Sequence, residues 1–463
     1  MPIGKKTRGE LRARGVLVVF VLLGAGACTS HIAHSPFIKA ALVEQDYDAA
    51  LERVEKIGKG SSRLLYLYEK ALILHYQERY EESNAAFDEA ELVYDELYTK
   101  SISREVGALL TSDNIIKYTG ENYEIAMLYY YKIFNYLYLN DPQGAIVECR
   151  KLNLLLQTFA DNEDTSEAND PFLHYLTGLV YMANGEASDA DVSLRVARET
   201  YAALGTRFGV QLPEHLYCDL ALGAAALGDY AAANSYRDSA QCDEHDEEGG
   251  TLDLFLECGY VPYKTEENAV IPLYKDEFDD NLKKDEYAST LRHRYGQPRD
   301  KKRKLQYLMR VSLPSMIVDP FPYPDVEADV VLGGRTIQAQ SQVVENLKVQ
   351  ATGAFDARRG GIIFKTIVRG LTKYLAKKGV EKKEGVVAGW LINALNVATE
   401  TADTRSWSTL PQFVRMVRLP LPEGEHDVTV RLYDAFGGQE ESFTIPNVKI
   451  MRGRTTFLNY RVY

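Results

Sequence analysis

The sequence predicts a multidomain protein in which a helical repeat array is followed by an α+β domain that contains a small antiparallel β-sandwich. Two observations predict this fold class. Small and large apolar residues recur at helical spacing, with turn residues between them, from residue 36 to about residue 243. From residue 305 onward, apolar and polar residues instead alternate in short runs that end at glycine and proline.

The N-terminus has the three parts of a secretory signal. Lys5 to Arg14 holds five basic residues, and the apolar run Val16–Ala25 is shorter than the ~20 residues that span a bilayer. Small residues then precede Cys28, which resembles the lipobox of bacterial lipoproteins. That resemblance implies cleavage before Cys28 and its acylation, which would hold the chain stably on a membrane. The alternative is an ordinary secretory signal. By the same resemblance, Thr29 implies the outer membrane, with the protein facing the periplasm.

Net charge and cysteine content exclude several classes of protein. The formal net charge is −13, and loss of residues 1–27 lowers it to −17, which argues against nucleic-acid binding. Four cysteines follow Cys28, too few and too scattered for a disulfide scaffold or a zinc site. A Cys242–Cys258 disulfide is compatible with an oxidising periplasm. The alternative is that all four are buried thiols, which we favour for Cys149 and Cys218.

The region 36–243 resembles the tetratricopeptide repeat, which is built from pairs of antiparallel helices. The small residue that allows two helices to approach is followed at fixed distance by a large residue that fills the gap to the next pair, such as Phe87 or Leu194. Turn signals separate the helices at Gln45-Asp46, Asn140-Asp141-Pro142, Asn184-Gly185 and Gly228-Asp229. About five helical pairs are expected.

Aromatic residues recur on the expected inner face of this array. Counting three residues back from each small residue gives Tyr68, Tyr130 and Tyr175, and Phe134 lies one turn further along. Tyrosine offers a large amphipathic contact area, so this series suits a surface that binds a protein partner. The alternative is that the rings pack inside a closed array, and the sequence leaves both interpretations open.

The remaining chain divides into a connector and a β-rich domain. The predicted organisation is a signal peptide (1–27), a lipidated tether (28–35), the helical array (36–243), a connector with one strand and charged segments (244–304), and a β-rich domain with inserted helices (305–463). The inserted helices are expected at 341–355, 362–377 and 386–402, from their apolar periodicity. Lys365, Arg369, Lys373 and Lys377 recur every four residues in the second, either as a solvated face or as a membrane-binding stripe.

Three segments together are similar to an uncharacterised family of bacterial tetratricopeptide-repeat lipoproteins. They are residues 112–153, 259–266 and 402–426. The resemblance implies a lipid anchor, a helical array and a β-rich C-terminal domain, but no known activity. Asp403, Arg405, Trp407 and Pro411 form its most distinctive motif. This motif is either structural, with an Asp403–Arg405 ion pair and a buried Trp407, or a docking site.

No catalytic, metal-binding or cofactor motif stands out, and the eight histidines are scattered. We therefore expect no enzyme and no cofactor. The expected function is that of a lipid-anchored periplasmic scaffold that binds protein partners, as a structural or assembly component of a cell-envelope machine for secretion, a pilus or a motor. Self-association is a further option for the β-rich domain. The alternative function is regulation of peptidoglycan synthesis, and an unrecognised enzyme is a third.

Overall fold

The computed structural model describes residues 31–56, 62–101, 117–162, 168–240, 242, 249–274, 305–384 and 403–463. The predicted leader, Cys28 and the helix expected at 386–402 lie outside these residues. Within them the chain has a helical part and a β-containing part, as the sequence predicts. No described helix is both long enough and apolar enough to cross a membrane.

The helical part consists of successive hairpins of helices joined by short turns. Its helices are α2 (His31–Val43), α3 (Tyr47–Glu55), α4 (Arg63–Tyr76), α5 (Tyr80–Ser101), α6 (Asn122–Tyr138), α7 (Pro142–Ala160), α8 (Pro171–Ala183), α9 (Ala187–Phe208), α10 (Leu216–Ala226) and α11 (Tyr230–Arg237). Each even-numbered helix up to α10 packs chiefly on the helix that follows it. The expected number of about five pairs is therefore present among the described residues.

The turns within these pairs share one local design. Gln45, Asn140 and Gly228 have a positive φ, which ends the first helix of the pair. The aspartate that follows each of them accepts a hydrogen bond from the backbone N–H three residues on, and so caps the second helix. The predicted turn residues are thus the residues that fix the hairpin geometry.

Small residues let the paired helices touch. A Cβ atom on Gly178 of α8 would lie 2.7 Å from Cδ2 of Leu194 in α9. In the α4–α5 pair, the Ser83 hydroxyl donates a hydrogen bond of 2.7 Å to the Ala71 carbonyl. Phe87 and Leu194 are fully buried, as gap-filling residues should be.

The strands form two four-stranded sheets and a separate ribbon. Sheet A has the order β10-β1-β7-β6, sheet C has the order β5-β4-β8-β9, and β2 and β3 form the two-stranded ribbon. The bounds are β1 (Gly249–Cys258), β2 (Tyr263–Tyr274), β3 (Leu305–Ile317), β4 (Asp325–Leu332), β5 (Arg335–Gln340), β6 (Gln342–Glu345), β7 (Phe413–Pro422), β8 (Gly424–Tyr433), β9 (Gln439–Ile450) and β10 (Thr455–Val462).

Strand β1 corrects the predicted division of the chain. It falls in the segment 244–304 that the sequence assigned to a connector, yet it is an inner strand of sheet A, parallel to β10 and antiparallel to β7. Sheet A is therefore mixed rather than antiparallel, and the β-rich part begins at Gly249 instead of residue 305. The alternation of residues within β1 cannot show which sheet the strand joins, because its hydrogen-bond pairing with β10 connects residues about two hundred positions apart.

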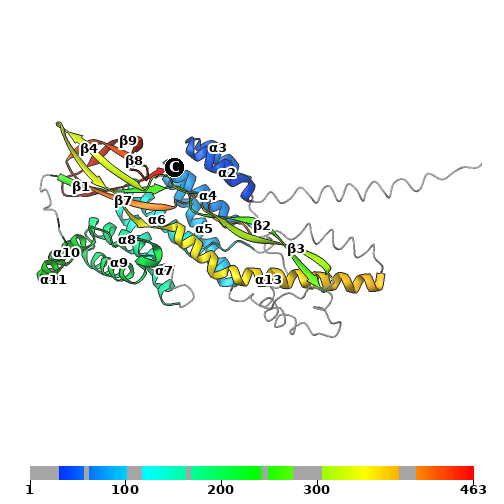
Figure 1. Ribbon diagram of the computed structural model, residues 1–463. Helices are drawn as coiled ribbons and strands as arrows, with labels where there is room; N and C mark the ends of the chain where they lie inside the picture. The colour runs from blue at the N-terminus through cyan, green and yellow to red at the C-terminus, as the bar shows by residue number, and fades with distance from the viewer. Residues whose placement is uncertain are drawn as a thin grey trace, which may run out of the picture.

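Both faces of β1 are buried, which makes sheet A the middle of three layers. Leu252, Leu254 and Leu256 point into the core shared with sheet C. Phe255 points the other way and contacts Phe134 of α6 and Phe172 of α8, with ring centroids 5.6 and 5.9 Å away. Figure 1 shows the helices on one side of β1 and β7, and sheet C on the other. One hydrophobic core thus joins the helices to sheet A.

Three further expectations were wrong, one about helices and two about cysteines. The helices predicted at 341–355 and 362–377 are one helix, α13 (Leu347–Glu384), and residues 342–345 before it are strand β6. The disulfide joins Cys218 to Cys242, so the Cys242–Cys258 pairing is wrong, and so is the expectation that Cys218 is a buried thiol. Cys149 and Cys258 are buried free thiols, and burial raises the pKa of the Cys258 thiol to about 12. Strand β1 places Cys258 inside the sandwich, out of reach of Cys242.

Candidate functional site

The inner-face aromatic residues lie between the helices and sheet A. Tyr68, Tyr130, Phe134 and Tyr175 are all fully buried. Helices α4, α6 and α8 position them, but the chain's own sheet A occupies the concave side that a partner would otherwise reach. Of the two interpretations that the sequence left open, the structure shows the second: the aromatic rings pack inside the protein, against strands that are distant in sequence.

Glu257 of β1 is the polar centre of this interface. Its carboxylate accepts hydrogen bonds from the hydroxyls of Tyr76 (2.6 Å), Tyr130 (3.1 Å) and Tyr131 (3.1 Å) and from the Asn459 amide (2.6 Å). Burial and then the Glu257 charge raise the pKa of each of the three tyrosines well above the usual value. The tyrosines therefore remain neutral donors that hold a buried carboxylate in place.

The Asp403–Pro411 motif is also part of the interface. Arg405 donates two hydrogen bonds of 2.8 Å to the Asp403 carboxylate, which is the expected local ion pair. Trp407 is fully buried and stacks on Tyr68, with ring centroids 4.6 Å apart, and Pro411 is buried as well. The motif thus packs the segment before β7 against α4. Of the two interpretations of this motif, the structural one agrees with its burial.

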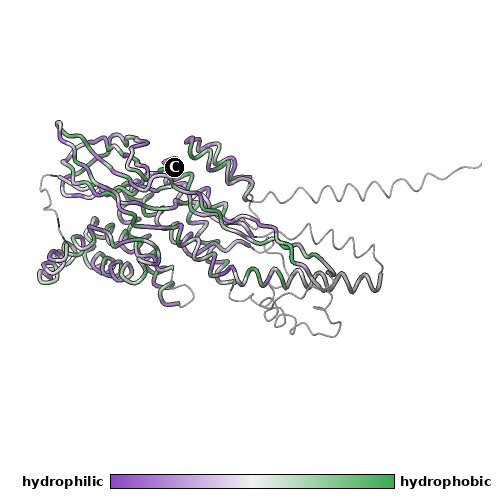
Figure 2. Tube along the Cα trace, viewed as in Figure 1, coloured by the Kyte–Doolittle hydropathy of each residue, from purple (hydrophilic) through white to green (hydrophobic). Residues whose placement is uncertain are grey.

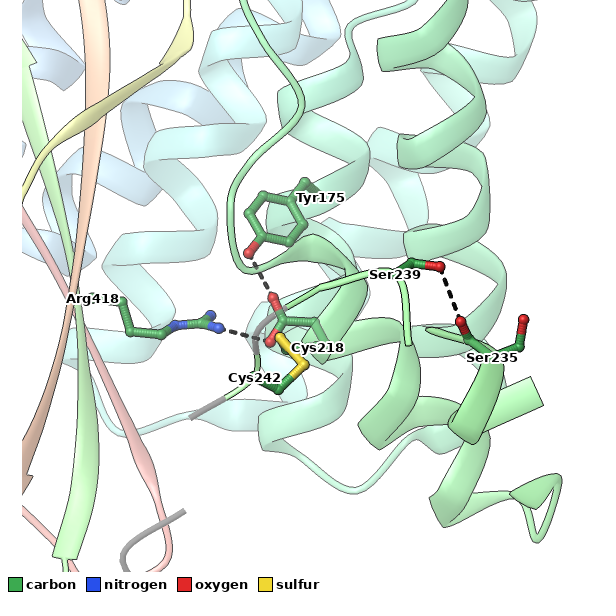
Figure 3. Close-up of a disulfide and its surroundings, with 7 residues drawn as sticks. Tyr175, Cys218, Ser235, Ser239, Cys242 and Arg418 are labelled. Atoms are coloured by element: carbon green, nitrogen blue, oxygen red, sulfur yellow. Dashed lines mark hydrogen bonds and ion pairs between the residues drawn. A yellow bond between two sulfur atoms is a disulfide. The ribbon is translucent and has the colours of Figure 1, made fainter. Parts of the chain in front are cut away.

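A second polar cluster joins β1 and β7 to α10. Arg418 donates two hydrogen bonds to Asp253, of 2.6 and 2.8 Å, and one of 2.7 Å to Asp219. Tyr175 donates to the other oxygen of Asp219, at 2.6 Å. Burial disfavours the Arg418 charge, but the two carboxylates outweigh it and raise its pKa. Figure 3 shows Tyr175 and Arg418 converging close to the disulfide.

Beside this cluster the inner face of the array is still open. Two adjoining cavities of about 390 Å³ each lie between α8, α10 and the ends of β1, β7 and β10. They share five lining residues, Asp219, Leu222, Thr251, Arg418 and Pro420. We call the two together the α10 cleft. It is the candidate functional site, because it is where sheet A leaves the concave surface of the helices uncovered.

Local sequence features hold the α10 cleft open and define its edges. The Cys218–Cys242 disulfide ties the segment after α11 back to α10. At the start of β1, a Cβ atom on Gly249 would lie 2.6 Å from the Leu421 carbonyl oxygen, and one on Gly250 would collide with the carbonyls of Met451 and Arg454. The two glycines are therefore needed for close backbone approach.

The α10 cleft combines apolar walls with basic residues at its ends. Leu179, Met182, Leu222 and Phe457 supply apolar surface. Arg237 lines one cavity and Arg454 the other, and both are exposed, with no ion pair to any described residue. Burial, and then Arg418, lower the pKa of His215, so this lining residue is neutral near pH 7. These features suit an extended ligand with apolar side chains and anionic groups.

The sequence did not identify this site, although two signals were available. Cys218 stands three residues before the small residue Ala221, as Tyr175 stands three before Gly178, and Leu179 stands one turn after Tyr175. Cys218 is half-buried, whereas Tyr68, Tyr130 and Tyr175 are fully buried, and this difference appears only in the tertiary structure. Among the described residues, no three histidine, cysteine or acidic side chains are grouped so that they could hold a metal ion.

Comparisons with known proteins establish neither a family nor a function. No family model matches the chain, and no curated protein matches it. Among solved structures, the crystal structure of MamA protein has 13% identity and a TM-score of 0.28, over 46% of this chain and 97% of that one. BtubC (BKLC) from P. vanneervenii has 15% identity and a TM-score of 0.30, over 45% of this chain and 77% of that one. At such TM-scores, neither likeness bears on the function.

Proposed function

We propose that this chain is a non-catalytic scaffold of the bacterial cell envelope, held on the periplasmic side of the outer membrane by a lipid on Cys28. Its helical array is proposed to be of the tetratricopeptide type. The array binds an extended segment of a partner protein in the α10 cleft, as a structural or assembly part of an envelope machine. The observation that carries the proposal is the uncovered stretch of concave surface at α10, next to a stretch that the chain itself fills.

The covered part of the array supports a scaffolding role. Hydrogen bonds from Tyr76 and Tyr130 to Glu257, and from Arg418 to Asp219, join helices to strands that are distant in sequence. Satisfied polar networks of this kind favour one relative orientation of the layers over others. Layers fixed in this way would present a ligand in the α10 cleft in a defined direction, which is what an assembly component requires.

The disulfide supports an envelope location. The Cys218–Cys242 bond lines the α10 cleft, so the shape of the site depends on its being oxidised. Structural disulfides persist in the periplasm and are rare in the cytosol. The disulfide is independent of the leader sequence, which is tested by Cys28→Ala. That change should release the protein from membranes, and unchanged membrane retention would contradict the anchor.

The charge of the α10 cleft defines the class of ligand. The net charge of the chain is −13, yet the cleft has Arg237 and Arg454 at its ends, neither of them ion-paired with a described residue. Between them lie apolar side chains and the ion-paired cluster of Asp219, Asp253 and Arg418. An acidic peptide with apolar side chains would place carboxylates on Arg237 and Arg454 and bury its apolar groups against Leu222. A basic segment would be repelled at both ends.

The test is crosslinking and capture from native membranes with matched variants. Arg237→Glu combined with Arg454→Glu should abolish capture of the main partner without a change in melting temperature. The control is Arg335→Glu combined with Lys449→Glu, which makes the same charge change at exposed positions of sheet C. Equal capture by both variants would show that the partner does not bind in the α10 cleft. Capture of a stoichiometric assembly would support a role as a component of an envelope machine. Capture of a substoichiometric peptidoglycan synthase would instead support regulation of peptidoglycan synthesis.

A further inference from the structure

Strand β10 is an outer strand of sheet A, so only one of its two edges pairs with a neighbour among the described strands. That neighbour is β1, where the Thr251 N–H donates a hydrogen bond of 3.0 Å to the Arg454 carbonyl. Successive residues of a strand turn their backbone groups to opposite edges. The N–H and C=O groups of Thr455, Phe457 and Asn459 therefore face away from β1.

The outward edge of β10 is covered at one residue and free at two others. The Asn459 N–H donates a hydrogen bond of 2.8 Å to the Tyr138 hydroxyl, so α6 covers the strand there. The outward backbone groups of Thr455 and Phe457 have no hydrogen-bond partner among the described residues. We call the outward side of Thr455–Phe457 the β10 edge. A free edge of this kind is a template to which another chain can add a strand.

The β10 edge lacks the features that protect two other outer strands. Strand β9, at the edge of sheet C, contains Pro446 and Lys449 and has two shifts of register against β8. Strand β6, at the far edge of sheet A, is four residues long and has one shift. Short length, proline, lysine and bulges all hinder edge pairing. The β10 edge is Thr-Thr-Phe in continuous register, and these residue types favour strands.

The β10 edge opens into the α10 cleft. Thr455 and Phe457 line the cavity of about 390 Å³ that Leu179 and Met182 of α8 also line. The Phe457 side chain belongs to the core between the helices and sheet A. A strand added here would turn every second side chain toward α8 and the others toward sheet C. Figure 2 shows hydrophobic and hydrophilic residues intermixed along the strands of both sheets, a pattern that the added strand should share.

We propose that the partner segment in the α10 cleft joins sheet A as a fifth strand, hydrogen-bonded to the β10 edge. This pairing rests on the proposed function, because the segment is the one that the array binds. The occupant is an amphipathic β-strand with apolar residues at alternate positions and a carboxylate at the end near Arg454. Arg454 directly precedes the β10 edge, lines the same cavity and is exposed, with no ion pair to any described residue.

The length of the β10 edge favours a single segment as its occupant. Tyr138 bounds the edge at Asn459, and a turn in which the Arg454 N–H donates to the Met451 carbonyl at 3.1 Å bounds it at the other end. A stretch of this length in a cleft beside α8 accommodates an extended peptide more readily than the whole edge of a second copy of the chain. Pairing through the backbone supplies affinity, and the alternate side chains in the cleft supply specificity.

The test uses synthetic peptides and the mature chain with Cys28→Ser, which carries no lipid. The peptides form a library of capped octapeptides in which leucine, valine or phenylalanine alternates with aspartate, glutamate or threonine. Mass spectrometry of the retained fraction identifies the best binder, and two N-methylated analogues of that peptide are then compared. Only every second N–H of a strand faces one edge, so methylation of one alternate set should abolish binding, and methylation of the other set should leave it unchanged.

A proline in the β10 edge tests the same pairing from the protein side. Thr455→Pro removes an outward N–H that does not pair with β1, and proline is tolerated at the first residue of a strand. It should weaken peptide binding about tenfold without lowering the melting temperature, because one carbonyl of the peptide loses its donor. The control is Gln439→Pro, at the first residue of the outer strand β9, which should leave binding unchanged. Should either proline lower the melting temperature, the methylated peptides still decide the matter in the unsubstituted protein.

Three results would overturn strand addition. They are an equal effect of the two methylations, retention of no peptide from the library, and a dimer that Thr455→Pro alone converts to a monomer, which would assign the edge to a second copy. If Arg237→Glu with Arg454→Glu still abolishes partner capture in such a case, the α10 cleft binds its partner and only the backbone pairing is wrong. If that variant captures the partner normally while the methylation pattern holds, the β10 edge binds strands and the proposed function is wrong instead.

Discussion

Replacement of Trp407 by alanine is expected to destabilise the helical array and sheet A together. The indole ring is fully buried, stacks on Tyr68 of α4 and lies 6.1 Å from the ring of Phe87 in α5 and 6.2 Å from that of Tyr131 in α6. It thus touches three helices from the segment that leads into β7. Its backbone N–H also donates a hydrogen bond of 2.7 Å to Glu124, which the substitution preserves.

The expected loss in free energy of unfolding is about 3–5 kcal/mol. Removal of a large buried aromatic ring costs this much, because transfer and cavity terms add. The stack on Tyr68 contributes about 0.5–1.5 kcal/mol of it. The indole N–H has no hydrogen-bond partner among the described residues, so the loss is one of packing. Trp407→Phe should consequently lose only about half as much, because it keeps most of the ring contacts.

Urea denaturation followed by far-UV circular dichroism measures the loss, and hydrogen exchange locates it. Amides of α4 and of β1 should lose protection to the same extent, since one core holds both. The control is Phe436→Ala, at a turn residue that is 97% exposed, with an expected change within about 0.5 kcal/mol. A loss below about 1 kcal/mol for Trp407→Ala, or faster exchange confined to the segment around residue 407, would refute the single-core reasoning.

Three further perturbations test the polar parts of the structure. Cys218→Ser opens a loop with a sequence separation of 24 and should lower the free energy of unfolding by about 3.5 kcal/mol in non-reducing buffer, an effect that dithiothreitol should reproduce in the wild type. Arg418→Met leaves the carboxylates of Asp219 and Asp253 buried without their partner and should cost about 3–5 kcal/mol, whereas a loss near zero in thermal melts would contradict the network. Burial and the neighbouring Glu121 raise the pKa of Glu124 from 4.5 to about 7. The folded protein therefore binds more protons than the unfolded chain between these values, so stability from this group is complete below about pH 4.5 and is lost as the pH rises through about 7. Glu124→Gln should flatten that part of the stability–pH profile, and an unchanged slope would exclude Glu124 as its source.

Local features of the chain were predictable because their causes lie within a few residues. The helical pairs follow from small residues such as Gly178 and from turns such as Asn140-Asp141-Pro142, which contain both the positive-φ residue and the capping aspartate. Strands β3, β4 and β7 to β10 follow from alternation over short runs. The Asp403–Arg405 ion pair needed only a separation of two residues.

The order and type of most elements and the acidic character of the chain could thus be predicted from local patterns. Which surfaces are covered depends on how the helices pack on the sheets. Asp253 and Glu257 alternate with leucines in β1, a pattern typical of a solvated face, yet the helical array buries both acids, and Arg418 and the tyrosines make that burial tolerable. Tyr130 of α6 is buried because sheet A packs on that face of the helix, whereas Leu222, on the corresponding face of α10, lines the α10 cleft. Coverage depends on pairing between β1 and β10, and such long-range contacts leave no local periodicity in the sequence.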